Sequence, residues 1–316
     1  MTKIASLPNI LAVLLAFGLS AVAAQAQVNE TWVSGHGTDS GTCTRDLPCR
    51  TFAFALTQTA AGGEIDVLDP AEYGTLTITQ SVSIINDSTG IAAIDSPVEN
   101  AIAISAGPSD SVYLRGLTLR GIGAGSSGVR LFTGGNVAIE NCVIRDFANA
   151  GINLSPTTSS SFSISNVIAS NNGHIGVRVH PRGTAVVTGV INKVTANNNG
   201  VFGITVDGVE STGASLNVTV AGSESSNNGK FGVIVFSQPG QTATAVTVRN
   251  TIASDDVSFG LSAGPNAILR VAHTKVSGNV NGVGTFGGGS IFSYGDNDIN
   301  GNMDDGLASL TPIAMH

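Results

Sequence analysis

The sequence predicts an all-β chain folded as a parallel β-helix, a solenoid in which coils of about 25 residues stack on one another. Three observations support this fold class. A small residue, glycine in all but one case, recurs ten times at intervals of 22 to 29 residues, and an aliphatic residue follows it within two positions. Strand-like segments of four to six residues lie between these steps and end at Gly, Asn, Asp or Ser. Asn, Asp and Gly recur in two further columns with the same period.

The repeat is clearest between residues 141 and 179, where one unit occurs twice with a displacement of 25 residues. The small-residue steps are Gly74, Ala101, Gly128, Gly151, Gly176, Gly203, Gly232, Gly260, Gly282 and Gly306. Ten steps predict about ten coils, and at about 4.8 Å per coil the rod would be about 50 Å long. An antiparallel sandwich is the alternative, but it does not explain the aligned columns.

Each coil is expected to bend at Asn or Gly, because these residues tolerate the left-handed backbone conformation. Stacked asparagine amides can also hydrogen-bond from coil to coil. We therefore predict a structural ladder along the corners, formed by Asn141, Asn166, Asn171, Asn192, Asn197, Asn227 and Asn250. The acidic pair Asp255-Asp256 falls in the same pattern, and we interpret it as a turn.

The first 26 residues are predicted to be a signal peptide. Lys3 precedes an apolar segment from Ile10 to Leu19, and Ala24-Gln25-Ala26 is a small-x-small cleavage site. The apolar segment is shorter than the roughly 20 residues that span a bilayer, and no other stretch approaches that length. We expect export to the periplasm or beyond, with residues 27–61 as an N-terminal cap and residues 62–316 as the β-helix.

The cap is expected to combine a disulfide loop with a short helix. Cys43 and Cys49 lie six residues apart in a turn-rich segment, and an oxidising compartment favours their pairing. Residues 51–60 place apolar side chains on one helical face, and Gly62-Gly63 ends that helix. Such a cap would cover the unpaired backbone groups at an open end of β-structure. Cys142 is interpreted as a small buried hydrophobe.

The charge balance argues against a nucleic-acid partner or an anionic membrane surface. The formal charge is −8, and removing Lys3 with the signal peptide makes it about −9. Phosphate binding needs clustered Lys and Arg, which such a chain lacks. The 40 glycines and 11% charged residues would suit disorder, but 42% hydrophobic residues indicate a buried core.

Two segments resemble a known group of proteins. CTRDLPCRTFAFALTQTAAGGEIDVLDPAEYG, residues 43–74, resembles the capping segment of exported bacterial right-handed β-helix repeat proteins in the pectate-lyase superfamily. IFSYGDNDINGN, residues 291–302, resembles the last coil of the same group. The resemblance spans nearly the whole mature chain and implies a right-handed parallel β-helix with a ligand groove over one sheet. It implies no particular reaction, because one fold hosts many functions.

Strand alternation predicts which residues face this groove. The aliphatic residue after each small-residue step points inward, so the next residue points outward. This column places Arg130, Asn153 and Arg178 on successive coils, and a second column two residues further places His180 beside Asp207. Backbones about 4.8 Å apart put His180 and Asp207 within hydrogen-bonding reach.

Phe132 and Phe236 flank this polar group in the second column. Because arginine pairs with carboxylates and aromatic faces cover sugar rings, the face suits an acidic sugar. We predict Arg130, Phe132, Asn153 and Phe236 as ligand-binding residues. The alternative is a polar, solvated sheet face without a ligand.

Three functions are compatible with these residues. The first is a non-catalytic exported protein that binds polysaccharide or another cell-surface ligand along this face. The second is a polysaccharide lyase or glycoside hydrolase that acts on uronate-containing glycans through Arg178, His180 and Asp207. The resemblance implies calcium only for a lyase, and no other cofactor or metal site is predicted. The third is a purely structural rod in the cell envelope.

Overall fold

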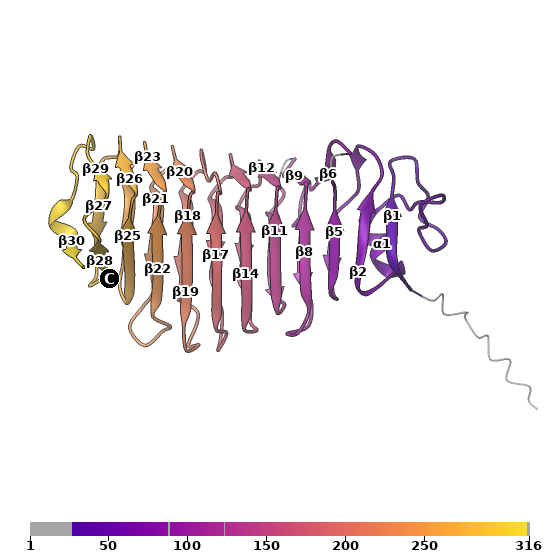
Figure 1. Ribbon diagram of the computed structural model, residues 1–316, viewed down its shortest axis with the longest axis horizontal. Helices are drawn as coiled ribbons and strands as arrows, with labels where there is room; N and C mark the ends of the chain where they lie inside the picture. The colour runs from indigo at the N-terminus through magenta and orange to yellow at the C-terminus, as the bar shows by residue number, and fades with distance from the viewer. Residues whose placement is uncertain (1–26, 88, 123, 315–316) are drawn as a thin grey trace, which may run out of the picture.

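The computed structural model describes residues 27–87, 89–122 and 124–314. The predicted signal peptide, residues 1–26, lies outside the described residues. The chain winds as a right-handed parallel β-helix whose coils stack along one axis (Figure 1), as the sequence predicted. Over the described ranges, nine coils contribute a strand to the sheet discussed below as sheet C, close to the predicted ten.

The longest face, sheet A, contains twelve strands within the described residues and runs from the cap to the last strand. All its neighbouring strands are parallel, and their order follows the chain. Its strands are β1 (Val28–Val33), β2 (Thr59–Val67), β5 (Val82–Ile85), β8 (Ser111–Arg115), β11 (Asn136–Glu140), β14 (Ser160–Ser165), β17 (Val187–Asn192), β19 (Leu216–Ala221), β22 (Thr244–Arg249), β25 (Ala267–Ala272), β28 (Ser290–Ser293) and β30 (Leu310–Pro312).

A second face, sheet C, contains the strands that follow the small-residue steps of the sequence. Its strands are β4 (Leu76–Ile78), β7 (Ile102–Ser105), β10 (Ser127–Thr133), β13 (Ala150–Leu154), β16 (Ile175–Val179), β18 (Phe202–Asp207), β21 (Phe231–Phe236), β24 (Phe259–Ala263) and β27 (Asn281–Thr285). These strands also pair in parallel, so each outward residue lies beside its counterpart on the next coil.

The third face, sheet B, is made of short strands in two groups, joined by bridges through Thr195. One group contains β3 (Ala71–Glu72), β6 (Ala92–Asp95), β9 (Leu117–Arg120), β12 (Val143–Arg145) and β15 (Ile168–Ser170). The other contains β20 (Glu224–Ser226), β23 (Ile252–Ser254), β26 (Lys275–Ser277) and β29 (Asp298–Ile299). A short 3-10 helix, η1 (Leu307–Ser309), precedes the last strand of sheet A.

The core is a set of aliphatic stacks that run along the inside of the rod. In sheet A, Ile84, Leu114, Ile139 and Ile164 are register partners on successive strands, and each is at most 1% exposed. Full burial of one such side chain stabilises the fold by about 1.5–3 kcal/mol. Because each coil repeats the same inward positions, coil stacking rather than local propensity holds the rod together.

The cap contains the predicted elements. Cys43 and Cys49 form a disulfide with a Cα–Cα distance of 4.9 Å. Helix α1 (Phe52–Gln58) buries Phe52, Ala55 and Leu56 against the first coils. It ends earlier than Gly62, since β2 begins at Thr59, immediately after the helix. No helix in the described part of the chain is long and apolar enough to cross a membrane.

A polar ladder runs inside one corner of the rod. Asn172 Nδ2 donates to Asn199 Oδ1 at 3.0 Å, and Asn199 Nδ2 donates to Asn228 Oδ1 at 3.1 Å. We call the whole row the amide ladder: Asn172, Asn199, Asn228, Asp256, Asn279, Asn302 and Asp305. The residues from Asn172 to Asn279 are at most 2% exposed.

The ladder does not use the asparagines that the sequence pattern indicated. Those residues lie at the corners and are exposed or half-buried: Asn141, Asn166, Asn171, Asn192, Asn197, Asn227 and Asn250. Five of them adopt positive φ values of 48° to 56°, and at the other two corners the positive φ falls on the next residue, Lys193 or Asn198. A left-handed residue turns its own side chain outward and presents a following one to the interior. For Asn171, Asn197 and Asn227 the prediction was therefore wrong by one or two residues, because the ladder uses Asn172, Asn199 and Asn228. For the other four it was wrong altogether, because Asn141, Asn166, Asn192 and Asn250 are followed by Cys142, Val167, Lys193 and Thr251 rather than by an amide.

Candidate functional site

Sheet C aligns the outward residues in the predicted register. Arg130 pairs with Asn153, Asn153 with Arg178, and Arg178 with Thr205, on strands β10, β13, β16 and β18. Their sequence neighbours Val129, Leu131, Ile152 and Leu154 are at most 1% exposed and point into the core. The alternation of inward aliphatic and outward polar residues thus builds one polar row across successive coils.

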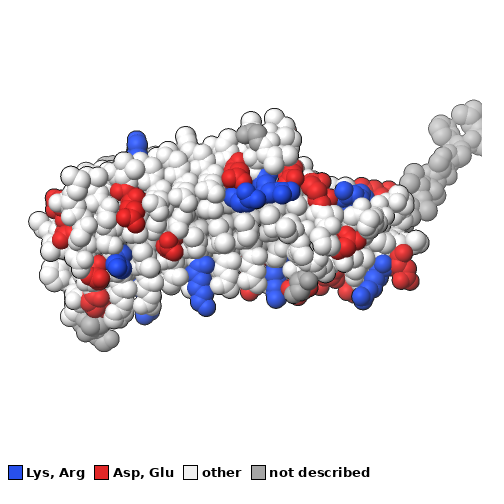
Figure 2. Space-filling view, turned by 90° about the horizontal axis from the view of Figure 1, so that it is seen from above, with Lys and Arg blue, Asp and Glu red and all other residues white. Residues whose placement is uncertain are grey.

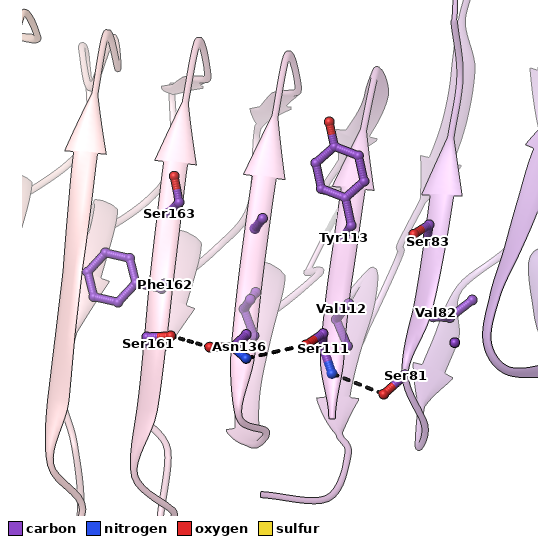
Figure 3. Close-up of a pocket in the computed structure, with 13 residues that line it drawn as sticks. Ser81, Val82, Ser83, Ser111, Val112, Tyr113, Asn136, Ser161, Phe162 and Ser163 are labelled. Carbon is purple, nitrogen blue, oxygen red and sulfur yellow. Dashed lines mark hydrogen bonds between the residues drawn. The ribbon is translucent and has the colours of Figure 1, made fainter. Parts of the chain in front are cut away.

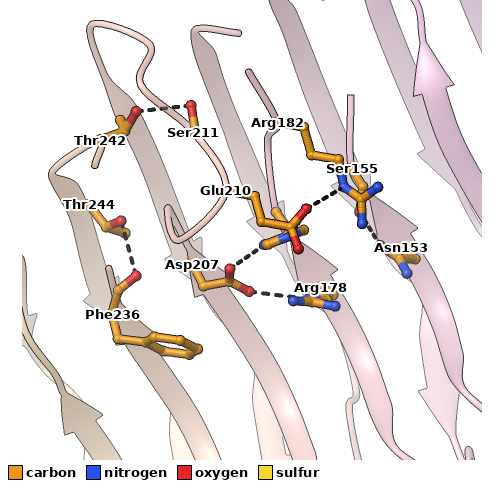
Figure 4. A network of polar contacts seen from close by, with 11 residues as sticks. Asn153, Ser155, Arg178, Arg182, Asp207, Glu210, Ser211, Phe236, Thr242 and Thr244 are labelled. Atoms are coloured by element: carbon orange, nitrogen blue, oxygen red, sulfur yellow. Dashed lines mark hydrogen bonds and ion pairs between the residues drawn. The ribbon is translucent and has the colours of Figure 1, made fainter. Parts of the chain in front are cut away.

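His180, Asp207 and Arg178 meet at the end of this row, and Figure 4 labels Asp207 and Arg178. Asp207 closes β18 and accepts a hydrogen bond from Arg178 Nε at 3.1 Å. Its other carboxylate oxygen contacts Nδ1 of His180, the residue that follows β16. His180 is 2% exposed and Asp207 is 1% exposed. The structure therefore brings the three predicted residues together, but it buries the histidine and the aspartate.

Two further charged residues complete the cluster, both on loops that follow strands. Glu210 Oε2 lies 3.0 Å from Arg182 Nε and 3.4 Å from His180 Nε2 (Figure 4). Arg182 and Glu210 are about half exposed, so Glu210 lies over the buried histidine. The spacing of the strands did not indicate Arg182, because loop residues follow no repeat register. We call Arg130, Arg178 and Arg182 the arginine patch.

Arg130 differs from the other two arginines of the patch. Among the described residues it forms no ion pair, whereas Arg178 and Arg182 each have one. Its Nε, like that of Arg182, is buried without a hydrogen-bond partner. Its guanidinium lies over the ring of Phe132, 5.1 Å from the centroid. Burial, followed by the positive charges of Arg182 and Arg178, lowers the pKa of Arg130. Arg130 is therefore a cation held beside other cations without an anion of its own.

The other predicted ligand-binding residues differ in exposure. Phe132 is 40% exposed, and Phe236 is half-buried next to Asp207 in the register. Asn153 is 1% exposed and accepts a hydrogen bond from Ser155 Oγ at 2.6 Å. Asn153 therefore lies beneath the exposed surface of the patch in this structure. Phe132 and Phe236 flank the patch.

The acidic residues of this face do not fit a calcium ion. Both oxygens of Asp207 are engaged by Arg178 and His180, and Glu210 is paired with Arg182. Calcium takes six to eight oxygen ligands, and these carboxylates would have to leave their cations to contribute. Over residues 27–87, 89–122 and 124–314, no group of three or more His, Cys, Asp and Glu is arranged to hold a metal ion.

Some of the other charged groups on the rod are paired, whereas Lys193, Lys230 and Arg249 are exposed and form no ion pair among the described residues. In the view onto the upper edge of the rod, charged side chains are sparse, and the largest blue group is flanked by red (Figure 2). On sheet B, Arg120 pairs with Asp95 at 2.6 Å and Arg145 with Asp146 at 2.5 Å. Arg130 is distinguished from these exposed cations by its partial burial and by its Nε, which is buried without a hydrogen-bond partner.

The outer face of sheet A has a hollow of about 390 Å³, which the sequence did not indicate (Figure 3). Small polar residues from neighbouring strands line it and bond to one another: Asn136 Nδ2 donates to Ser111 Oγ at 3.3 Å, and Ser161 Oγ contacts Asn136 Oδ1. Tyr113 donates to Glu140, and burial raises the pKa of its hydroxyl. Because these groups satisfy one another, the arginine patch is the stronger candidate site.

Comparisons with known proteins agree with the fold. The model of the right handed beta helix region family matches residues 72–216. The crystal structure of pectate lyase Pel9A has a TM-score of 0.64 and 14% identity, covering 85% of this chain and 75% of that one. The A-module of mannuronan C-5 epimerase AlgE6 from Azotobacter vinelandii gives 0.47 and 17%, covering 81% and 88%.

A lacto-N-biosidase of family GH136 from Eubacterium ramulus gives a TM-score of 0.37 at 11% identity, covering 90% of this chain and 67% of that one. No curated protein matches by sequence. The family match over residues 72–216, the parallel coils and the lyase structure show that the chain has a right-handed parallel β-helix fold like that of the pectate lyase. At these identities the neighbours define the fold and not the reaction.

Proposed function

We propose that the chain is an exported protein that binds acidic polysaccharide, with the carboxylates of the polymer seated on the arginine patch. The observation that supports this proposal most directly is Arg130, a partly buried cation with no ion-pair partner among the described residues. A carboxylate bound there would receive charge-assisted hydrogen bonds and relieve the repulsion from Arg178 and Arg182. Arginine suits this role because its planar fork matches a carboxylate.

The surroundings of the patch support a sugar rather than a free anion. Phe132 lies beneath Arg130 and Phe236 lies beyond Asp207, so aromatic surface borders the cations on both sides. Coils repeat about every 4.8 Å along the rod, so an extended polymer lying along it would pass Arg130, Asn153 and Arg178 in turn. The pectate lyase with the similar fold is named for an acidic polymer, which fits this class of ligand.

The proposed function includes export of the protein from the cytoplasm. The Cys43–Cys49 disulfide is typical of proteins in oxidising compartments. The segment expected to direct export lies outside the described residues.

The binding proposal is tested by calorimetric titration with oligogalacturonate, oligomannuronate and a neutral dextran oligomer. We expect binding of the two acidic polymers only, weakened by salt because screening reduces charge attraction. Arg130→Met should weaken binding about tenfold, the effect of losing one charge-assisted contact worth about 1.4 kcal/mol. Arg249→Met, which removes an exposed arginine from β22 on sheet A, is the matched control. Equal binding of dextran, or equal losses in both variants, would contradict the proposal.

A polysaccharide lyase or glycoside hydrolase is the second candidate. The observation that favours it is the contact of Asp207 with His180 Nδ1, which orients the ring, while Nε2 lacks a hydrogen-bond partner. A carboxylate that orients a histidine in this way is a common arrangement for a general base. Glu210 would have to move before a substrate could reach Nε2.

The two candidates separate in an assay of unsaturated and reducing ends released from uronate polymers. An enzyme should release them in the wild type, and Asp207→Asn should abolish the release because the histidine loses its orienting carboxylate. Binding without product release from a broad glycan panel would leave the first proposal standing and remove the second.

A further inference from the structure

The carboxylate of Glu210 lies in the cluster at a position that an acidic group of a ligand could also take. Its Oε2 lies 3.0 Å from Nε of Arg182, with which it forms an ion pair, and 3.4 Å from Nε2 of His180. The His180 ring is 2% exposed, and its Nε2 has no hydrogen-bond partner in the described residues, since the approach of Glu210 does not meet hydrogen-bond geometry. A buried, unpartnered ring nitrogen therefore points at a side chain that is 53% exposed.

The backbone that supports Glu210 is fixed, whereas its side chain projects from the surface. The carbonyl of Glu210 accepts from the Gly183 backbone N–H at 2.9 Å, and the N–H of Thr212 donates to the Gly183 carbonyl at 2.7 Å. The two loops that follow β16 and β18 are thereby tied together. The Glu210 carboxylate can leave Arg182 by side-chain rotation alone, without breaking these backbone bonds.

The charges around Glu210 favour an anion at this place. Arg130 lies near enough to Arg182, Arg178 and Glu210 for all three charges to affect it, and only Glu210 acts on it favourably. A carboxylate at this position thus serves Arg182 directly and Arg130 at longer range. The same chemical group on a ligand would meet the same cations.

We propose that Glu210 occupies a carboxylate subsite formed by Arg182, His180 and the adjacent Arg130, and that the uronate carboxylate of a bound polymer replaces it. The inference rests on the proposed polysaccharide binding and places one acid group of the ligand at this subsite. Glu210 is then an internal competitor that lowers affinity and rejects neutral polymers, which offer nothing to replace its contact with Arg182.

The test is titration of Glu210→Gln with oligogalacturonate and with the dextran oligomer. The amide keeps the shape of the side chain but removes the competing charge, so affinity for oligogalacturonate should rise about tenfold. Arg182→Met should weaken binding, because the subsite loses its principal cation. Glu30→Gln, on exposed β1 of sheet A, removes the same charge away from the patch and should leave affinity unchanged.

The outcomes distinguish this inference from the binding proposal. If the wild type binds oligogalacturonate and Arg130→Met weakens it, but Glu210→Gln does not strengthen it, the binding proposal stands and the subsite is refuted. Equal gains in Glu210→Gln and Glu30→Gln would also refute the subsite, since net charge alone would explain them. If neither the wild type nor any variant binds an acidic polymer, both proposals fail.

Discussion

Two polar rows run along the same rod and differ in how their groups are satisfied. In the amide ladder, each asparagine from Asn172 to Asn279 bonds to the equivalent residue of the next coil, as Asn199 does to Asn172 and Asn228. In the arginine patch, Arg130 and Arg178 lie two coils apart with Asn153 between them, and Arg130 has no anionic partner among the described residues. A solenoid repeats its geometry from coil to coil, so identical amides can pair by repetition, whereas identical charges can only repel.

This difference separates structure from function on physical grounds. A buried amide that donates and accepts within a row stabilises the fold and needs nothing from outside. A partly buried cation beside like charges costs free energy unless an external anion completes it. Loss of a fully bonded ladder amide should therefore change stability more than loss of the unpaired Arg130.

The largest expected effect is in the middle of the ladder. Asn199→Ala removes two side-chain bonds to neighbouring asparagines and the donation from Nδ2 to the Ala169 carbonyl at 3.2 Å. The partners stay buried without bonds, so we expect a loss of about 4 kcal/mol in the free energy of unfolding, measured by urea denaturation. The control, Asn217→Ala on the exposed face of β19, should change it by less than about 0.5 kcal/mol. Similar losses in both variants would show that the ladder contributes no more than a surface amide.

A smaller change in the free energy of unfolding, of opposite sign, is expected when Asp256 is substituted. Asp256 is the acidic residue between Asn228 and Asn279 in the amide ladder. Its Oδ1 accepts two bonds from Asn228, at 2.9 and 3.0 Å, but its buried Oδ2 has no hydrogen-bond partner. Burial raises the pKa of Asp256 from 3.8 to about 7. The folded state therefore binds the proton of the Asp256 carboxyl group more tightly than the unfolded state does. The contribution of this protonated group to the free energy of unfolding is full below pH 4 and is lost as pH rises towards 7.

Asp256→Asn should remove this loss, because an amide is neutral at every pH and can donate where Oδ2 is unpaired. At pH 8 we expect a gain of about 3 kcal/mol in the free energy of unfolding, falling to about zero at pH 4. Urea denaturation across this pH range measures both values. A gain that is the same at both pH values would show that Asp256 is not protonated on folding.

The two rows also differ in how far the sequence could predict them. The patch register follows from the Gly-aliphatic steps, because strand alternation has a period of two that drift between coils does not disturb. The ladder was misplaced because a corner has no such period: Asn171 takes the left-handed conformation, and the adjacent Asn172 turns inward. Doubled amides such as Asn227-Asn228 were the available indication. Loop contacts, such as that of Glu210 with Arg182, depend on backbone paths that the repeat does not encode.

The smallest stability effect is expected at Arg130, where the largest binding effect is proposed. Arg130→Met loses the contact with Phe132 but also removes a cation repelled by Arg178 and Arg182. A cation–π contact is worth about 0.5–1 kcal/mol at a partly exposed site, and relief of burial and repulsion offsets it. We expect the free energy of unfolding to change by less than about 1 kcal/mol in either direction, measured by urea denaturation at low salt.

Arg178→Met provides the contrast within the same patch. Its Nε donates to Asp207, which is 1% exposed, so removing Arg178 leaves a buried carboxylate with His180 as its remaining partner. Breaking a buried pair in this way costs about 3 kcal/mol. A loss at Arg130 as large as that at Arg178 would mean that Arg130 is satisfied within the fold. The arginine patch would then resemble the amide ladder, and Arg130 would need no anion from a ligand.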